Sequence, residues 1–183
     1  MMTVAEFIAF ADAQPSQRFE LLAGAPVAMA PATYRHQKIC TNIDRALGPR
    51  LAGRGCEAMR ELGLARSQDD DFLPQPDVTV RCGPAKETGR WFDDPVVVIE
   101  VLSPSTMADD RGYKFKQYQT FPTLRHLVLV YQSEMRVEHW SRAETGEWSE
   151  GPGVLHEALD VLALPAVGVE LPLSVVYEGL SLT

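Results

Sequence analysis

The alternation of apolar and polar residues predicts that the chain opens with a short amphipathic helix followed by a β-hairpin. Thr3 is followed three residues later by Glu6, which is the spacing of a capping box, and apolar residues then recur at helical intervals. Residues 18–22 and 26–30 have strand character and flank a turn in which Gly24 can adopt a positive φ angle. We therefore expect one helix and two paired strands in this part of the chain.

A second, longer helix is expected to begin after Thr33, which can cap it. Its apolar residues recur at every fourth position, at Ile39, Ile43, Leu47 and Leu51. Pro49 should kink or shorten its last turn, because proline donates no backbone hydrogen bond. Residues 56–67 carry only a weak pattern, which indicates a strand or a hairpin.

Four later segments have the composition of β-strands. Residues 76–81 alternate between polar and apolar positions, whereas residues 96–102 are almost continuously apolar. Continuous apolarity means that both faces of a strand are covered, so we expect residues 96–102 to form the central strand. Residues 125–131 indicate another buried strand, and residues 135–142 alternate and can pair with it through a short turn.

The central strand is expected to lead into a helix. Pro104 holds the residue before it extended and ends the strand. Asp109 and Asp110 then favour the positive end of a helix that runs to about Tyr118. The C-terminal residues carry strand-like segments and then a helical pattern over 173–180.

The composition fits a single globular domain. A length of 183 residues is typical of one domain, and 45% hydrophobic with 23% charged residues is close to the globular average. We find no internal repeat, linker or low-complexity segment in the sequence. Together with the alternation of helices and strands, this predicts an α/β fold over residues 1–183, with a central mixed β-sheet flanked by helices.

Cysteine usage and the N-terminal residues indicate a soluble, cytoplasmic protein. Cys40, Cys56 and Cys82 are odd in number and include no Cys-x-x-Cys pair, so we expect neither a disulfide framework nor a zinc knuckle. The N-terminal residues lack the basic region of a signal peptide, and no apolar run approaches the ~20 residues that a bilayer requires. We therefore expect no membrane partner.

The charge balance limits how the chain could bind nucleic acid. The 25 acidic and 17 basic side chains give a formal net charge of -8. Nonspecific affinity for nucleic acid comes from neutralising phosphates with lysine and arginine, so this balance argues against a tight, purely electrostatic binder. It does not exclude an enzyme whose metal ions bridge its carboxylates to phosphate.

Glu100 is the first candidate for chemistry, because it interrupts the apolar run of the central strand. An uncompensated charge in such an interior costs on the order of several kcal/mol. The alternatives are a structural salt bridge or a side chain that reaches solvent at the end of the strand. Asp77 opens the preceding strand after Pro76, and carboxylates on two adjacent strands suit Mg²⁺ or Mn²⁺. Pro76-Asp77 is also an ordinary turn dipeptide.

Lys114 is the third candidate, on the helix that follows the central strand. The residues that share its face at helical spacing are Asp110, Arg111, Gln117 and Tyr118. Lys116 lies about 200° away around the helix, so only one lysine can face the carboxylates. The alternative is a surface ion pair between Asp110 and Lys114, which is worth only ~0.3–0.5 kcal/mol.

Several motifs follow one another in a fixed order from about Arg18 to Tyr131. They are RFELLAG, a small-apolar stretch ending in MAP, His36 before a helix, PDV, IEVLSPST and D-x-x-x-K-x-x-x-Y. This ordered set resembles the Uma-type family of bacterial restriction-endonuclease-like proteins, within the PD-(D/E)XK nuclease superfamily. IEVLSPST with the spaced lysine is its most specific part. The resemblance implies a restriction-endonuclease-like core and hydrolysis of phosphodiester bonds.

One position departs from the general pattern of the superfamily. In the simple E-x-K arrangement the lysine comes two residues after the glutamate, where this chain has Leu102. The family implies a lysine supplied by the following helix, where Lys114 matches and Lys116 is the weaker candidate. Glu20 resembles an additional acidic residue that accompanies the core pair; without that resemblance, a solvated strand residue would explain it about as well. His36 matches a histidine of the family, and the sequence assigns it no chemistry.

We therefore predict a metal-dependent endonuclease that acts on nucleic acid, with DNA favoured over RNA. The predicted catalytic residues are Asp77, Glu100, Lys114 and Glu20. The predicted ligands of Mg²⁺ (or Mn²⁺) are Asp77, Glu100 and the backbone carbonyl of Val101. Lys114 would orient the attacking water or stabilise the transition state. Arg111 and Gln117, on the same helical face, are the predicted phosphate contacts.

Two further expectations concern partners. A homodimer would suit a nuclease that cuts two strands, and Trp140 and Trp148 could support it, although tryptophans in a hairpin are more often core. The alternative function is a non-catalytic nucleic-acid or protein binding module that retains the nuclease fold, which the acidic charge favours. Signature motifs of other enzyme classes, such as G-x-S-x-G and H-E-x-x-H, do not occur in the sequence.

Overall fold

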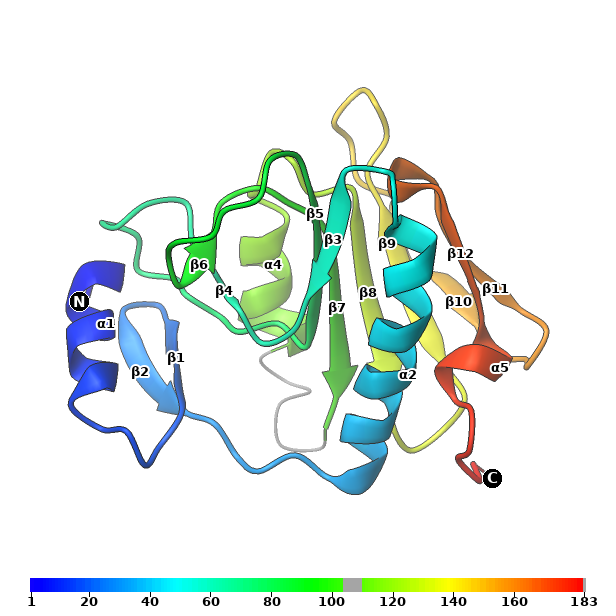
Figure 1. The fold of residues 1–183 in the computed structure, drawn as a ribbon, viewed down its shortest axis with the longest axis horizontal. Helices are drawn as coiled ribbons and strands as arrows, with labels where there is room; N and C mark the ends of the chain where they lie inside the picture. Colours follow the sequence, from blue (N-terminus) through cyan, green and yellow to red (C-terminus); the bar gives the residue numbers. More distant parts are fainter. Residues whose placement is uncertain (104–109, 183) are drawn as a thin grey trace.

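A six-stranded mixed β-sheet forms the centre of the computed structural model, which describes residues 1–103 and 110–182 (Figure 1). Its strands, in spatial order, are β10 (Gly153–Leu155), β9 (Val137–Ser141), β8 (His126–Tyr131), β7 (Pro95–Leu102), β5 (Val78–Cys82) and β3 (Cys56–Met59). Strands β7 and β8 are parallel, and every other neighbouring pair is antiparallel. The predicted mixed sheet is therefore confirmed, with the predicted central strand inside it.

Helices cover both faces of this sheet. On one face α2 (Tyr34–Leu51) packs with α5 (Leu173–Val176) and with the hairpin of β11 (Val161–Leu164) and β12 (Val169–Pro172). On the other face lie a π-helical turn (Asp110–Lys114) and α4 (Phe115–Tyr118) (Figure 1). The side chains of β7 alternate between these two layers, because successive residues of a strand point to opposite faces.

The N-terminal elements form a smaller layer beside the α4 face. Helix α1 (Val4–Asp12) begins at the predicted capping box of Thr3 and Glu6. The predicted hairpin is β1 (Phe19–Leu22) paired with β2 (Ala25–Ala28), with Ala23 and Gly24 both at positive φ. A short parallel pair, β4 (Gly63–Leu64) and β6 (Trp91–Phe92), lies next to it.

Three local expectations need correction or refinement. The weak segment 56–67 forms β3 and β4, which belong to different sheets and do not make a hairpin. Helix α2 continues to Leu51, two residues past Pro49. The predicted C-terminal helix begins at Leu173 but is one short helix that ends at Val176. The expected roles of Pro104 and Asp109 lie outside the described residues.

The expectation that no disulfide fits the cysteines was wrong. Cys56 in β3 and Cys82 in β5 are opposite one another in the strand register and are joined by a disulfide. Their spacing of 26 residues carried no sign of this, because strand register alone decides which side chains meet. Cys40 is buried as a free thiol in α2.

The two tryptophans of the β9 region pack within the chain. The ring of Trp140 meets Phe115 of α4 edge to face, with the ring centroids 4.7 Å apart. The guanidinium of Arg142 lies 5.6 Å from the ring centroid of Trp148. Both tryptophans are half-buried against the α4 side of the core, as the core interpretation expects.

In the described part of the chain, no helix combines the length and apolarity needed to cross a bilayer.

A histidine pair, of which His126 is buried and His139 half-buried, joins β8 to β9. His126 Nδ1 lies 2.9 Å from His139 Nε2, and His126 Nε2 accepts a hydrogen bond from the backbone N–H of Ala166. His126 Nε2 therefore carries no proton when it accepts this bond, which favours a neutral ring. Burial, together with the charges of His139 and Arg125, lowers the pKa of His126 to about 4. Burial also lowers the pKa of His139.

We expect the free energy of unfolding to decrease as the pH falls from about 6.5 towards 4, by up to about 3 kcal/mol for His126 alone. Above this range His126 is neutral in the folded and unfolded states, whereas within it only the unfolded state binds the proton. Urea unfolding at about pH 7.5 and about pH 4.5 measures the difference. His126→Phe should lose less stability between these two pH values than the parent protein. An equal loss would show that His126 does not contribute.

Candidate active site

Glu100 lies on β7 and is almost completely buried, with 3% of its surface exposed. Its Oε1 atom is 2.9 Å from Lys114 Nζ and accepts a hydrogen bond of 2.5 Å from the hydroxyl of Tyr118. Its Oε2 atom accepts a longer bond, of 3.3 Å, from the backbone N–H of Asp77. The buried charge of Glu100 is therefore compensated by Lys114 and Tyr118, which both belong to the α4 layer.

Lys114 lies between two carboxylates. It is 4% exposed, and its Nζ atom is 2.9 Å from Glu100 Oε1 and 3.3 Å from Glu20 Oε1. The π-helical turn and α4 place Lys114 and Tyr118 on the side that faces β7, as the helical spacing predicts. Burial, followed by the charge of Glu100, raises the pKa of Tyr118 well above its ordinary value, so its hydroxyl stays protonated and donates.

Glu20 reaches the site from the β1–β2 hairpin. Its Oε1 atom also accepts a hydrogen bond of 2.7 Å from the backbone N–H of Gln75, whose side chain donates to the carbonyl of Phe19. The hairpin is thereby joined to the segment that leads into β5. This geometry makes Glu20 a partner of Lys114 in the described structure, which its solvated-strand interpretation did not foresee.

Asp77 lies immediately before β5, where the antiparallel register with β7 continues towards Glu100. Its Oδ2 atom accepts a hydrogen bond of 2.7 Å from the backbone N–H of Val101. Its Oδ1 atom is 3.1 Å from His36 Nε2, and the two side chains are 15% and 13% exposed. The two predicted acidic ligands are therefore neighbours across β5 and β7, with Asp77 at the more accessible end.

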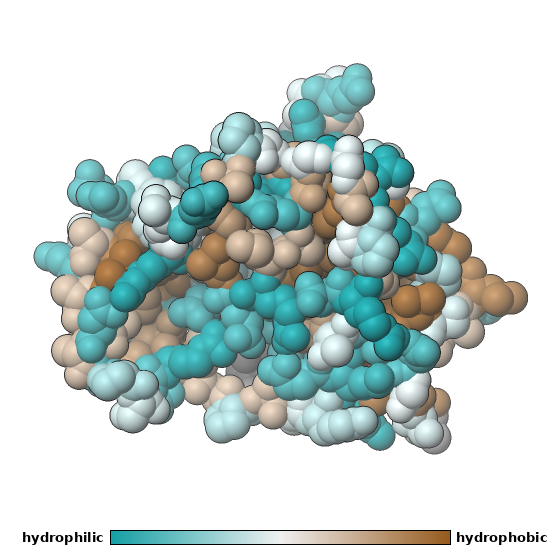
Figure 2. Space-filling model, in the orientation of Figure 1, coloured by the Kyte–Doolittle hydropathy of each residue, from teal (hydrophilic) through white to brown (hydrophobic). Residues whose placement is uncertain are grey.

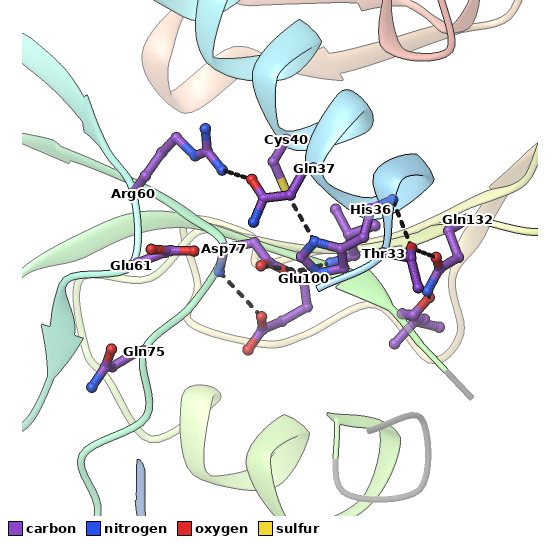
Figure 3. Close-up of polar contacts among 12 residues, drawn as sticks. Thr33, His36, Gln37, Cys40, Arg60, Glu61, Gln75, Asp77, Glu100 and Gln132 are labelled. Carbon is purple, nitrogen blue, oxygen red and sulfur yellow. Dashed lines mark hydrogen bonds and ion pairs between the residues drawn. The ribbon is translucent and has the colours of Figure 1, made fainter. Parts of the chain in front are cut away.

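His36 is the site residue to which the sequence assigned no chemistry. It lies in the first turn of α2, where Thr33 accepts a hydrogen bond from its backbone N–H, and its ring lies between Asp77 and Cys40 (Figure 3). Burial lowers the pKa of His36, but its hydrogen bond to Asp77 and the charge of that carboxylate outweigh burial, so the pKa is raised overall. Two features of the sequence could have pointed to His36 as a site residue: the helix cap at Thr33, which fixes its place in the first turn, and its match to a histidine of the family.

The structure brings together the four residues predicted to be catalytic, which are Glu20, Asp77, Glu100 and Lys114. Lys116, the weaker candidate, is exposed on the opposite side of its helix. The side chain of Arg111 pairs with Glu138, and Gln117 accepts a hydrogen bond from Arg66. Both predicted phosphate contacts therefore already have protein partners.

The donor atoms of this site suit a divalent cation. Asp77 and Glu100 supply carboxylate oxygens, which hard cations prefer, and His36 adds an imidazole nitrogen, which suits transition metals. Ligand atoms of His36, Cys40 and Asp77 lie within 4.8 Å of one another. Figure 2 shows that hydrophilic side chains gather over the middle of this face of the molecule, between the α1 layer and α2. Asp77 belongs to this group of three potential ligands and is also bonded through its backbone N–H to Glu100, the partner of the buried Lys114.

Comparison with known proteins identifies relatives along most of the chain. Residues 4–175 match the family model Uma2, described as "Putative restriction endonuclease". Two proteins of Synechocystis sp. (strain PCC 6803) are similar: "Uncharacterized protein slr1290" is 28% identical over 90% of this chain and 86% of its own length, and "Uncharacterized protein sll1609" is 27% identical over 81% and 85%.

A solved structure shares the fold. It is the crystal structure of "a putative nuclease belonging to DUF820" from Anabaena variabilis, with a TM-score of 0.74 over 97% of this chain and 98% of that chain. The sequence identity is 17%, so this likeness concerns the fold. The predicted α/β fold with a central mixed sheet therefore has the architecture of that protein.

Tyr118→Phe should lower the free energy of unfolding by about 1–3 kcal/mol, because a buried carboxylate loses a hydrogen-bond donor. Chemical denaturation measures this change. Tyr34→Phe is the matched control, since Tyr34 is 76% exposed and should tolerate the substitution. Equal stability of the two variants would contradict the role given to the Tyr118 hydroxyl.

Proposed function

The chain belongs to the Uma2 family, and from this premise we propose that it is a metal-dependent endonuclease that hydrolyses phosphodiester bonds of nucleic acid, DNA above all. One observation carries the proposal: side chains from four separate segments meet where β7 ends and β5 begins, at one end of these two strands of the central sheet. Glu20 comes from β1, Asp77 from the start of β5, Glu100 from β7 and Lys114 from the turn before α4. Burying charged side chains costs free energy of folding, and a buried ion pair often stabilises a fold no more than apolar residues would. Such a cluster is therefore better explained by a function than by stability.

Asp77 and Glu100 are the proposed holders of Mg²⁺ or Mn²⁺, together with the backbone carbonyl of Val101. The chemistry that such a cation supplies is neutralisation of phosphate charge and a lower pKa for the attacking water. The hydrogen bond from Val101 N–H fixes one oxygen of Asp77, and the bond from Asp77 N–H orients Glu100. The backbone of Asp77 thus orients Glu100, and the backbone of the residue after Glu100 orients Asp77.

Lys114 is the proposed cationic group of the reaction. Its ammonium would orient the attacking water or donate to the phosphate oxygens as negative charge develops on them. Glu20 and Glu100 hold the ammonium from two sides, and Tyr118 fixes Glu100 in turn. Glu20 and Tyr118 are therefore positioning residues, because they act through Lys114 and Glu100.

Arg60 is the proposed phosphate contact. Its Nη2 atom donates to Gln37 Oε1 over 2.8 Å, and its buried Nε atom has no hydrogen-bond acceptor (Figure 3). Among the described residues it forms no ion pair, unlike Arg111, which is paired with Glu138. An arginine on the α2 side of the site, close enough for its charge to act on His36 and fixed by a neutral amide, would leave that charge to a phosphate of the bound strand.

We expect the purified protein to nick supercoiled plasmid in the presence of Mg²⁺ or Mn²⁺. Asp77→Asn and Lys114→Met should each lower the rate by about 100-fold or more, because they remove a cation ligand and the cationic group. Lys116→Met is the matched control and should keep the parental rate, since this lysine is exposed away from the site. The measurement is conversion of supercoiled to open-circular DNA over time, with single strands and RNA as parallel substrates.

The same experiment separates the proposed function from a binding module that retains only the fold. Such a module would bind nucleic acid after chelation of divalent cations and would be indifferent to Lys114→Met. Cleavage by the parent and by Asp77→Asn alike would indicate a contaminating nuclease. The absence of a metal-dependent nick in the parent protein, or equal nicking by the parent and Asp77→Asn, would refute the proposed activity.

Arg60→Gln should weaken binding of a DNA duplex and make its salt dependence shallower by about one unit of log affinity per log salt, because one phosphate contact is lost. Fluorescence anisotropy of a labelled duplex across a salt series measures both effects. Arg90→Gln is the control, since Arg90 is exposed and, unlike Arg60, already paired with a carboxylate, that of Asp12 in α1. An unchanged affinity and slope in Arg60→Gln would exclude this residue as a phosphate contact.

A further inference from the structure

A group of three side chains borders the proposed cation site on its α2 side. His36 and Cys40 are one helical turn apart on α2, and Asp77 approaches them from the start of β5 (Figure 3). His36 Nε2 is 3.1 Å from Asp77 Oδ1, and His36 Nδ1 is 3.7 Å from Cys40 Sγ. The imidazole therefore points one nitrogen at a proposed cation ligand and the other at a thiol.

The two oxygens of Asp77 have different surroundings. Oδ2 is engaged by the backbone N–H of Val101, which is part of the sheet and cannot move away easily. Oδ1 is the oxygen that faces His36. A cation that binds Asp77 through Oδ1 would therefore approach the atom to which His36 Nε2 also points.

The separation of these two atoms suits ligation. Adjacent ligands of an octahedral cation with bonds of about 2.1–2.2 Å are about 3 Å apart. The observed 3.1 Å between His36 Nε2 and Asp77 Oδ1 is close to this value. The same distance also fits the hydrogen bond that joins the two groups, so a cation could take the place of the shared proton without moving either side chain far.

We propose that His36 Nε2 is a nitrogen ligand of the cation held by Asp77, and that it makes this site prefer Mn²⁺ to Mg²⁺. The inference rests on the proposed function, whose cation site it defines further. Imidazole suits transition metals, whereas Mg²⁺ prefers oxygen ligands and keeps several waters. Carboxylate and water ligands suit both cations, so a site of carboxylates alone would distinguish them less.

Cys40 has a supporting place in this arrangement. Cys40 is a buried free thiol whose Sγ atom lies 3.7 Å from His36 Nδ1. A thiol is a weak donor and a weak acceptor, and Cys40 can therefore pair with either tautomer of His36 at Nδ1. A residue that holds the second nitrogen of a ligating histidine fixes the orientation of the ring.

The test is the affinity of the whole protein for Mn²⁺ and for Mg²⁺, each measured by titration calorimetry. His36→Gln should weaken Mn²⁺ binding at least tenfold and Mg²⁺ binding less than about threefold. His156→Gln is the matched control, since His156 is exposed in a loop outside the site, and it should change neither affinity. A second measurement needs no variant: pulsed electron paramagnetic resonance of the Mn²⁺-loaded protein should detect a directly bonded imidazole nitrogen.

The outcomes distinguish this inference from the function on which it rests. Equal losses for both cations in His36→Gln, or no loss for either, would overturn it, as would a Mn²⁺ spectrum without ligand nitrogen. Plasmid cleavage that depends on Asp77 would still support the nuclease in those cases. If the parent protein bound neither cation, the proposed function and this inference would both fail.

Discussion

The burial of Lys114 between Glu20 and Glu100 is the interaction on which the site depends. An ammonium that is 4% exposed cannot be left without anionic partners, because an uncompensated buried charge costs on the order of several kcal/mol. Its partners come from the N-terminal hairpin and from the central strand, so these segments must dock together before the charges are compensated. The geometry of the site and the stability of this part of the fold are consequently linked.

The side chains of β7 alternate between two helical layers, so neighbouring residues of this strand contact different parts of the molecule. Glu100 meets the α4 layer through Lys114 and Tyr118, whereas Val97, Ile99 and Val101 pack in the core beneath α2. The end of β7 is also where α2 approaches with His36 and where β5 begins. A strand with helices on both faces thus has polar side chains from each layer close to its C-terminal end. In this way a small domain can place a polar site beside an apolar core.

The charged groups at the site are arranged differently from the net charge of the whole chain, which is strongly negative. The formal net charge of -8 disfavours binding to phosphates over the surface at large. Around the site, however, the carboxylates are oriented by backbone N–H groups and by Lys114. Arg60, which donates to Gln37 on the α2 side, has no carboxylate partner among the described residues. Under the proposed function, phosphate would bind at this one place, where a cation and two basic side chains would compensate its charge.

The sequence by itself determined the features that depend on neighbouring residues. Helix caps at Thr3 and Thr33, the turn at Gly24 and the buried central strand follow from spacing along the chain, because backbone conformation and the faces of helices and strands have fixed periods. Spacing also showed that only one of Lys114 and Lys116 can face the carboxylates, and the family resemblance selected Lys114 and added Glu20. Only the tertiary structure decided that Cys56 meets Cys82 and that His36 meets Asp77. These contacts depend on strand register and on the docking of a helix against a sheet, and no local spacing encodes either.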